Sequence, residues 1–137
     1  MKKLIISVLM FCFVPVLFTA CDDTASINTN YSLSLAIDPD AEYINRDTNA
    51  NVLIRVRVYD SKGNMVTDHG NITWVLKYIR NGESNFEKIP DDRFISSKPY
   101  SDAILNISHF FAGDFIEISA YYLNAKQTVT FTVTSNS

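Results

Sequence analysis

The stretch Val52-Leu-Ile-Arg-Val-Arg-Val-Tyr59, followed by Asp60-Ser-Lys-Gly-Asn64, decides the fold of this chain. Every second residue of the first segment is aliphatic, and two arginines lie between them. This alternation puts one set of side chains on a core face and the other towards solvent, which is typical of a half-buried β-strand. The second segment predicts a turn, because Gly63 can adopt a positive φ angle without steric cost and the side chain of Asp60 can cap the turn.

Alternation with a period of two recurs along the rest of the chain, and turn residues such as Asn81-Gly82 separate the segments. No segment between residues 31 and 135 shows the 3.6-residue period of an amphipathic helix. The strand count and spacing predict an all-β fold, an antiparallel β-sandwich of about seven strands. The other expected strands are Tyr31–Ile37, Ile72–Tyr78, a short Phe94-Ile95, Ala103–Ile107, Ile116–Tyr122 and Val129–Val133.

Some residues in this pattern have expected structural roles. Trp74 alternates in phase with its aliphatic neighbours, so we interpret it as a core anchor rather than as an exposed platform for a sugar. Gly113 is expected to allow the bend before the next strand. We also expect a single helical turn over Ser108–Ala112 and a chain reversal at Asn124–Lys126.

Three segments in this order resemble bacterial immunoglobulin-like (Ig-like) domains, of the kind found in adhesins and cell-surface proteins. They are Val52–Val66, whose strand ends in Asp-x-x-Gly-x-x-Val, then Ile72–Trp74, and then Ala112–Tyr122. The resemblance implies one Ig-like β-sandwich domain over residues 31–135 and an extracytoplasmic location. It implies no catalytic residues.

The first 20 residues have the layout of a secretory signal peptide. Lys2 and Lys3 precede an apolar run over residues 4–18, which is shorter than the about 20 residues of a membrane-spanning helix. The ending Leu17-Phe-Thr-Ala-Cys21 resembles the lipobox of bacterial lipoproteins, which implies cleavage before the cysteine and a diacylglycerol thioether on its sulfur. The alternatives are a plain anchor helix and an ordinary secreted protein. We favour lipidation, because it leaves no unpaired thiol once Cys12 departs with the signal peptide.

The residues that follow are expected to form a polar tether over 21–30. Asp22 and Asp23 resemble the acidic sorting signal that takes lipoproteins of the Bacteroidetes to the cell surface, so we favour a surface-exposed outer-membrane protein. In enteric bacteria, an Asp after the cysteine instead resembles an inner-membrane retention signal. A solvated acidic linker is the third interpretation. Asp23-Thr24-Ala25 also matches the O-glycosylation pattern described for Bacteroidetes, which makes Thr24 a candidate glycosylation site.

Length and charge limit the partners of the chain. Removing 20 of the 137 residues would leave 117, which suits a single domain. Loss of Lys2 and Lys3 would leave 10 basic against 15 acidic side chains, a net charge of −5. A chain this acidic has no basic stripe for nucleic acid, so we expect none. Contact with a membrane is expected through the lipid on Cys21.

Four acidic residues between the first two expected strands are the candidate metal ligands. Carboxylate oxygens are the ligands that Ca²⁺ prefers, but the spacing here is not that of an EF-hand loop. We interpret them as solvated surface residues, with a calcium site as the alternative. They are Asp38, Asp40, Glu42 and Asp47.

No motif in the sequence indicates an enzyme. There is no Gly-x-Ser-x-Gly segment and no glycine-rich phosphate loop, and neither His69 nor His109 has a second metal ligand at a suitable spacing. We therefore expect no catalytic residues and no cofactor. A small hydrolase is the alternative, and it would need one of these histidines to meet an acid and a nucleophile in one cleft.

The expected function is a lipid-anchored, non-catalytic module that binds protein or glycan at the cell surface through end loops, Asp38–Asn51 or Ser84–Tyr100. The alternative is a structural or accessory subunit of an envelope assembly, which would pair its Thr128–Thr134 edge with another chain. Aromatic residues outside the core pattern are candidates for a recognition surface, although burial is the favoured interpretation. These are Phe110, Phe111, Tyr121, Tyr59 and Tyr100.

Overall fold

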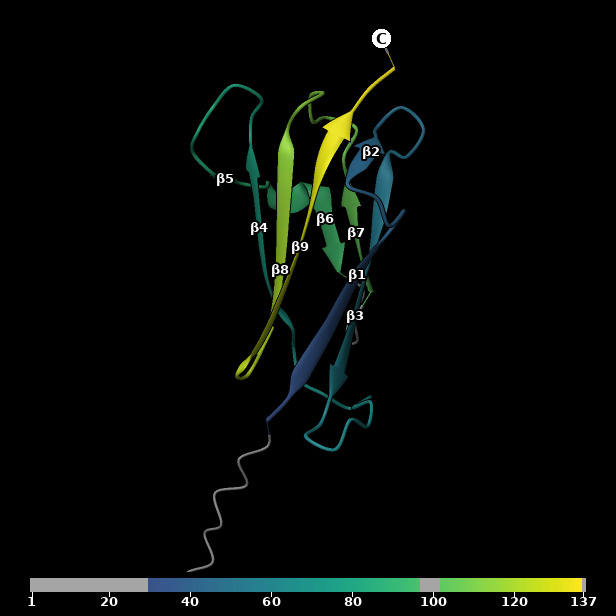
Figure 1. Ribbon diagram of the computed structural model, residues 1–137, viewed down its shortest axis with the longest axis vertical. Coiled ribbons are helices and arrows are strands. Elements are labelled where there is room, and N and C mark those ends of the chain that lie inside the picture. The colour runs from purple at the N-terminus through teal and green to yellow at the C-terminus, as the bar shows by residue number, and fades with distance from the viewer. Residues whose placement is uncertain (1–29, 97–101, 137) are drawn as a thin grey trace, which may run out of the picture.

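A computed structural model describes residues 30–96 and 102–136 (Figure 1), and its regular elements are nine strands and one short 3-10 helix. The expected signal peptide, the lipidation site and the tether before Asn30 lie outside the described residues. In chain order the elements are β1 (Ser32–Asp38), β2 (Tyr43–Asn45), β3 (Asn51–Tyr59), β4 (Thr73–Ile79), β5 (Glu87–Lys88), η1 (Asp91–Arg93), β6 (Phe94–Ser96), β7 (Asp102–Asn106), β8 (Phe115–Tyr122) and β9 (Ala125–Thr134).

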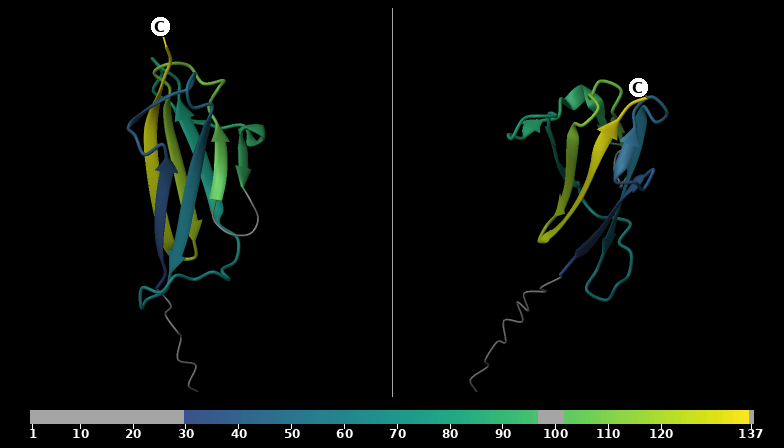
Figure 2. Two further views of the ribbon diagram at one scale, coloured as in Figure 1. Left: turned by 90° about the vertical axis from the view of Figure 1, so that its right-hand side faces the viewer. Right: turned by 45° about the horizontal axis from the view of Figure 1, so that its top comes forward.

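The strands form two layered sheets (Figures 1 and 2). One sheet has the order β1-β3-β7-β6, and the other has the order β2-β9-β8-β4-β5. All paired strands are antiparallel except β2 and β9, which run parallel. These orders correspond to strands A, B, E and D facing G, F and C of an Ig-like sandwich. The chain crosses from the first sheet to the second at β2, and β5 adds an edge strand. The predicted Ig-like β-sandwich is confirmed.

Burial follows the alternation that the sequence predicted. The core-facing residues of β3 are fully buried and pack with buried residues of β8 and β9, such as Ile116, Ile118 and Phe131. In β3 these residues are Val52, Ile54, Val56 and Val58. Trp74 of β4 is partly buried and packs against both groups of core residues. Its ring lies 5.3 Å from that of a phenylalanine on β6, so it joins the two sheets as a core anchor. Burial of such side chains, at about 1.5–3 kcal/mol each, is the main source of stability.

Some local details differ from expectation. β2 and β5 were not predicted, because strands of three and two residues are too short to show alternation. The last hairpin turns at Leu123–Asn124 instead of Asn124–Lys126, because the buried Ala125 already belongs to β9. Ser108–Ala112 forms turns instead of a helical turn, and the one helical element in the described part of the chain is η1.

Different loops form the two ends of the sandwich. The N-terminal end comprises Tyr31, the loop 60–72 and the hairpin turn 123–124, and the backbone N–H of Tyr31 donates to Asn124 Oδ1 at 3.4 Å. The C-terminal end comprises the loops 46–50, 80–86 and 107–114 and the end of β9. In Figure 1 the first strand starts at the bottom, and the chain finishes at the top.

Candidate functional site

The loop 107–114 at the C-terminal end places two adjacent phenylalanine rings in different surroundings. Phe110 is buried, and its ring packs edge-on against Tyr78 at a centroid distance of 5.2 Å. Phe111 is 57% exposed. The backbone N–H of Phe110 closes a turn on Ile107 O at 3.1 Å, so the next side chain emerges towards solvent. Burial was the favoured interpretation for both rings, and it is confirmed for Phe110 and wrong for Phe111.

The other candidate aromatic residues contribute less exposed surface. Tyr59 and Tyr121 have intermediate burial on the outer faces of their sheets, and Tyr100 lies outside the described residues. Phe111 is therefore the candidate whose exposed ring stands at an end of the sandwich.

A buried carboxylate fixes the loop that carries these rings. The side chain of Asp114 is fully buried and accepts the backbone N–H groups of Asn81 and Phe111 at 3.0 and 2.9 Å. The Arg80 guanidinium lies 3.9 Å from Asp114 Oδ2. Because a buried charge is costly unless it is hydrogen-bonded and paired, these contacts hold the loop 107–114 against the turn that follows β4.

Gly113 makes this close approach possible, as expected. Its φ angle is +91°, a region that side chains disfavour, and a Cβ atom added there would lie 2.9 Å from Asn81 Cβ. The loop can therefore pass the turn only with glycine at this position.

Two guanidinium groups lie against the exposed ring of Phe111. Arg80 Cζ is 4.7 Å from the ring centroid and Arg46 Cζ is 6.0 Å from it, both within the range of cation–π attraction. Arg46 comes from the turn after β2 and also donates from Nη1 to Phe110 O. The two arginines come from different loops, so only the folded chain brings them together.

A third arginine lies beside a small cavity that Arg80 also lines. Arg93 ends η1, and its Nη1 is 2.6 Å from His109 Nδ1. A guanidinium can only donate, so Nδ1 accepts and the neutral imidazole carries its proton on Nε2. The cavity has a volume of about 180 Å³. It is lined by Tyr78, Arg80, Pro90, Arg93, His109 and Phe110.

Arg80 links the exposed ring to this cavity. Its Nη2 donates to the Tyr78 hydroxyl at 3.2 Å, and that hydroxyl donates in turn to Glu87 Oε2. The hydrogen bond to Tyr78, helped by the nearby Asp114 carboxylate, raises the pKa of Arg80 above its ordinary value. The guanidinium is therefore held in place as a permanent cation.

We define the arginine cluster as Arg46, Arg80 and Arg93. Within the described part of the chain, most N–H donors of these guanidinium groups make no hydrogen bond. Each guanidinium has five N–H donors, and among these residues each makes a single hydrogen bond. A carboxylate lies near each one at 3.7–3.9 Å, which is too far for a hydrogen bond. These three carboxylates match the three positive charges of the cluster in number, but at these distances they leave the donors unoccupied. The surface therefore offers directional donors beside an exposed aromatic ring.

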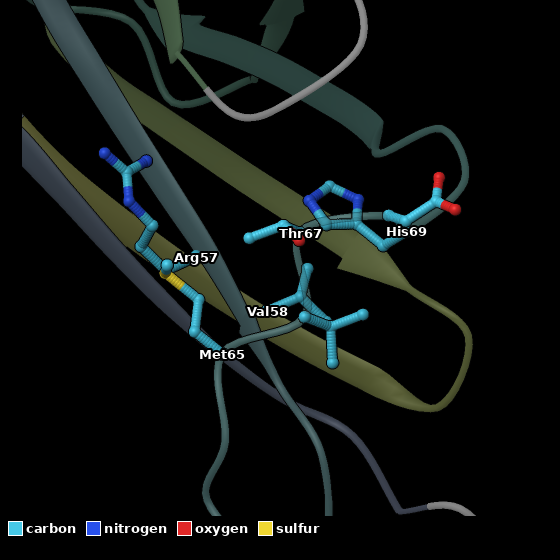
Figure 3. Close-up of a pocket in the computed structure, with 7 residues that line it drawn as sticks. Arg57, Val58, Met65, Thr67 and His69 are labelled. Carbon is cyan, nitrogen blue, oxygen red and sulfur yellow. The ribbon is translucent and has the colours of Figure 1, made fainter.

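A second hollow, of about 500 Å³, lies at the N-terminal end (Figure 3). Val58 and Met65 lie between the Arg57 guanidinium and the ring of His69. Arg57 Nη1 donates to Asp102 Oδ1 at 2.9 Å, and the buried His69 has its Nδ1 2.9 Å from the carbonyl oxygen of the next residue. Arg57 is thus engaged with β7 and His69 within its own loop, so this hollow is the less suitable binding site.

The two histidines lie at opposite ends of the sandwich. His109 Nδ1 is 2.8 Å from Ser108 Oγ, but that hydroxyl is also 2.6 Å from Asn106 Oδ1, and Arg93 donates to the same imidazole nitrogen. Among residues 30–96 and 102–136, the partners of His109 are thus a hydroxyl and a guanidinium, and not a carboxylate that would orient it as a base. His109 and its neighbours in the described ranges therefore do not form a Ser-His-acid arrangement.

The four candidate calcium ligands are not brought together. Asp38 pairs with Arg55 at 3.2 Å, and Asp47 accepts a backbone N–H near the C-terminus at 2.7 Å. Asp40 and Glu42 are exposed. Within the described ranges, no three His, Cys, Asp or Glu side chains converge as metal ligands.

The remaining predicted site residues fall before the described part of the chain. They are the lipidation site Cys21, the sorting residues Asp22 and Asp23, and the glycosylation candidate Thr24. No helix in the described ranges is both long and apolar enough to span a membrane.

Sequence reasoning did not single out the arginine cluster. Its members stand alone in loops far apart in the sequence, and a lone loop arginine has no pattern that marks it. The pair Phe110-Phe111 and the two proposed binding loops were the sequence features that indicated this region, and the loops contribute Arg46 and Arg93 to it.

No model of a known protein family matches the chain, and no curated protein matches it either.

Proposed function

We propose that this protein is a non-catalytic binding module, held at the outer surface of the cell envelope by lipid on Cys21. Its C-terminal end would be the surface that meets protein or glycan ligands. The lipid and the location are supported by the resemblance of the N-terminal segment to lipoprotein signals.

The observation that carries the proposal is the difference between the two ends of the sandwich. Tyr31 lies at the N-terminal end of the sandwich and is ten residues after Cys21 in the sequence. Ten residues span at most about 35 Å, so a lipid on that cysteine would keep this end near the membrane. The opposite end carries the exposed Phe111 and the arginine cluster. Aromatic residues and arginine are the residue types enriched at recognition surfaces.

Lipid attachment is tested by the replacement Cys21→Ser, which removes the sulfur that would carry it. We expect the unchanged protein to partition into the detergent phase of a temperature-induced phase separation, and the variant to partition into the aqueous phase. Equal partitioning of the two proteins, with residues 1–20 absent from both, would contradict lipidation.

Ligand binding is tested by probing panels of immobilised glycans and extracellular proteins with the full chain carrying Cys21→Ser. We expect Phe111→Ala to abolish binding. Leu123→Ala is the matched control, because Leu123 is 75% exposed at the other end of the sandwich. An absence of any ligand, or equal losses in both variants, would contradict the proposal.

A second candidate function is an accessory subunit that pairs through a strand edge, and unpaired backbone favours it. The expected edge at Thr128–Thr134 is partly occupied, because β2 pairs with Thr132–Thr134. Among residues 30–96 and 102–136, β9 before Thr132 pairs only with β8, and β6 is an edge strand whose Ile95 is 68% exposed. Sedimentation of the Cys21→Ser chain with and without Ile95→Lys would test it, since pairing through β6 predicts a complex that this variant loses.

A further inference from the structure

We propose that the C-terminal end binds an acidic sugar unit, whose carboxylate is held by the arginine cluster while its ring rests against Phe111. This inference rests on the proposed binding function and specifies the chemical class of its ligand. The juxtaposition that carries it is three guanidinium groups with unused donors around one exposed ring and one small cavity.

The donors determine the charge of the ligand. Guanidinium groups have no acceptor, so only an acceptor-rich group can satisfy the unused N–H donors of the cluster. A planar carboxylate matches the fork of a guanidinium, and the resulting bidentate pair is among the stronger hydrogen-bonded contacts. The nearby carboxylates of Asp47, Asp92 and Asp114 lie 3.7–3.9 Å from the guanidinium nitrogens and leave these donors available.

The cavity determines the size of the bound unit. Its volume is about 180 Å³. At about 30 Å³ for each water molecule, such a volume holds roughly six waters, which a single six-membered sugar ring would displace.

The remaining lining groups suit the rest of a sugar. His109 presents its Nε2–H as a donor, because Arg93 occupies Nδ1, and the Tyr78 hydroxyl is already ordered by Arg80 and Glu87. Sugar hydroxyl groups can accept from such donors. Pro90 and Phe110 line the cavity, and the exposed ring of Phe111 lies outside that lining, against Arg80, where it offers apolar surface to the C–H face of the sugar. An acidic peptide would supply the carboxylate without this combination of hydroxyl groups and a flat ring.

The test is calorimetric titration of the full chain carrying Cys21→Ser. Three probes are compared: an oligosaccharide of galacturonate units, the neutral galactose oligosaccharide of the same length, and an oligomer of glutamate. We expect the acidic sugar to bind and the neutral sugar to bind at least tenfold more weakly, because hydrogen bonds to charged groups are lost. We also expect added salt to weaken the binding of the acidic sugar.

Two arginine variants locate the site. Arg93→Gln is expected to weaken binding of the acidic sugar at least tenfold. Arg55→Gln is the matched control, because Arg55 is an exposed arginine on the outer face of the other sheet, paired with Asp38, and it should leave binding unchanged. Thermal unfolding of both variants establishes that they are folded.

Several results would overturn the inference. These are equal binding of the neutral sugar, equal binding of the glutamate oligomer, or unchanged affinity in folded Arg93→Gln. If the panels still show a ligand that depends on Phe111, the proposed function stands and only the ligand class is wrong. If they show no ligand at all, the proposed function fails as well.

Discussion

Replacing the buried carboxylate beneath the candidate site, as Asp114→Ala, is expected to destabilise the fold by about 2–4 kcal/mol. Asp114 is fully buried and accepts two backbone N–H groups at 3.0 and 2.9 Å. The variant leaves both donors without this partner and leaves Arg80 without its buried counter-ion.

The magnitude follows from those contacts. A hydrogen bond to a charged group contributes about 1.5–3 kcal/mol, so two of them give about 3–6 kcal/mol. Water can reach the exposed turn at Asn81 and replaces part of this loss, which lowers the expected effect. Because a domain of this size is stable by about 5–15 kcal/mol, the variant should still fold. Asp114→Asn keeps one acceptor oxygen and should lose about half as much.

The assay is urea unfolding of the full chain carrying Cys21→Ser, followed by the fluorescence of Trp74, the single tryptophan. Asp38→Ala is the matched control, because the ion pair of Asp38 with Arg55 is exposed and should contribute less than about 1 kcal/mol. A loss below about 1 kcal/mol in Asp114→Ala, or a loss equal to that of the control, would refute the reasoning.

Three further predictions concern turns. Gly113→Ala should destabilise the fold by more than about 2 kcal/mol, because it adds a clash with Asn81 to a φ of +91°. Gly63→Ala, at a φ of +81° with open space around it, should lose only about 1 kcal/mol of stability. Equal losses of stability in urea unfolding would contradict this difference. Leu123→Gly should stabilise by about 0.5–1 kcal/mol because Leu123 has a φ of +48° and is 75% exposed, and a lower unfolding midpoint would count against it. Hydrogen bonds within its turn lower the pKa of Asp60 below 3.8, so the contribution of Asp60 to stability is present above about pH 4 and is lost as the pH falls through the lowered pKa. Asp60→Asn should remove this loss of stability at acid pH. An unchanged dependence of stability on pH in the variant would contradict the prediction.

The sequence predicted the fold well where the physical signal was local and repeated. The alternation over β3 and β8 identified the core faces, and the turn residues Gly63 and Gly82 have the positive φ angles that their positions required. Strands such as β2 and β5 were missed because their pairing depends on longer neighbours rather than on their own few residues.

The candidate site was harder to predict because it is assembled from distant segments. Arg46 and Phe111 are 65 positions apart in the sequence and meet only through the crossing of the chain at β2. The opposite surroundings of Phe110 and Phe111 depend on one turn hydrogen bond, which no periodicity reveals. Local patterns therefore identified the scaffold, and the tertiary fold alone brought the binding groups together.

The central claim is that the chain is held at its N-terminal end and presents its C-terminal end to the medium. The most direct test places a thiol on the exposed Ala112 as Ala112→Cys and labels intact cells with a membrane-impermeant maleimide. Lipidation of Cys21 would leave this as the only free thiol of the mature chain. We expect equal labelling in intact and lysed cells, with a periplasmic control labelled only after lysis. Labelling of Ala112→Cys only after lysis would contradict it.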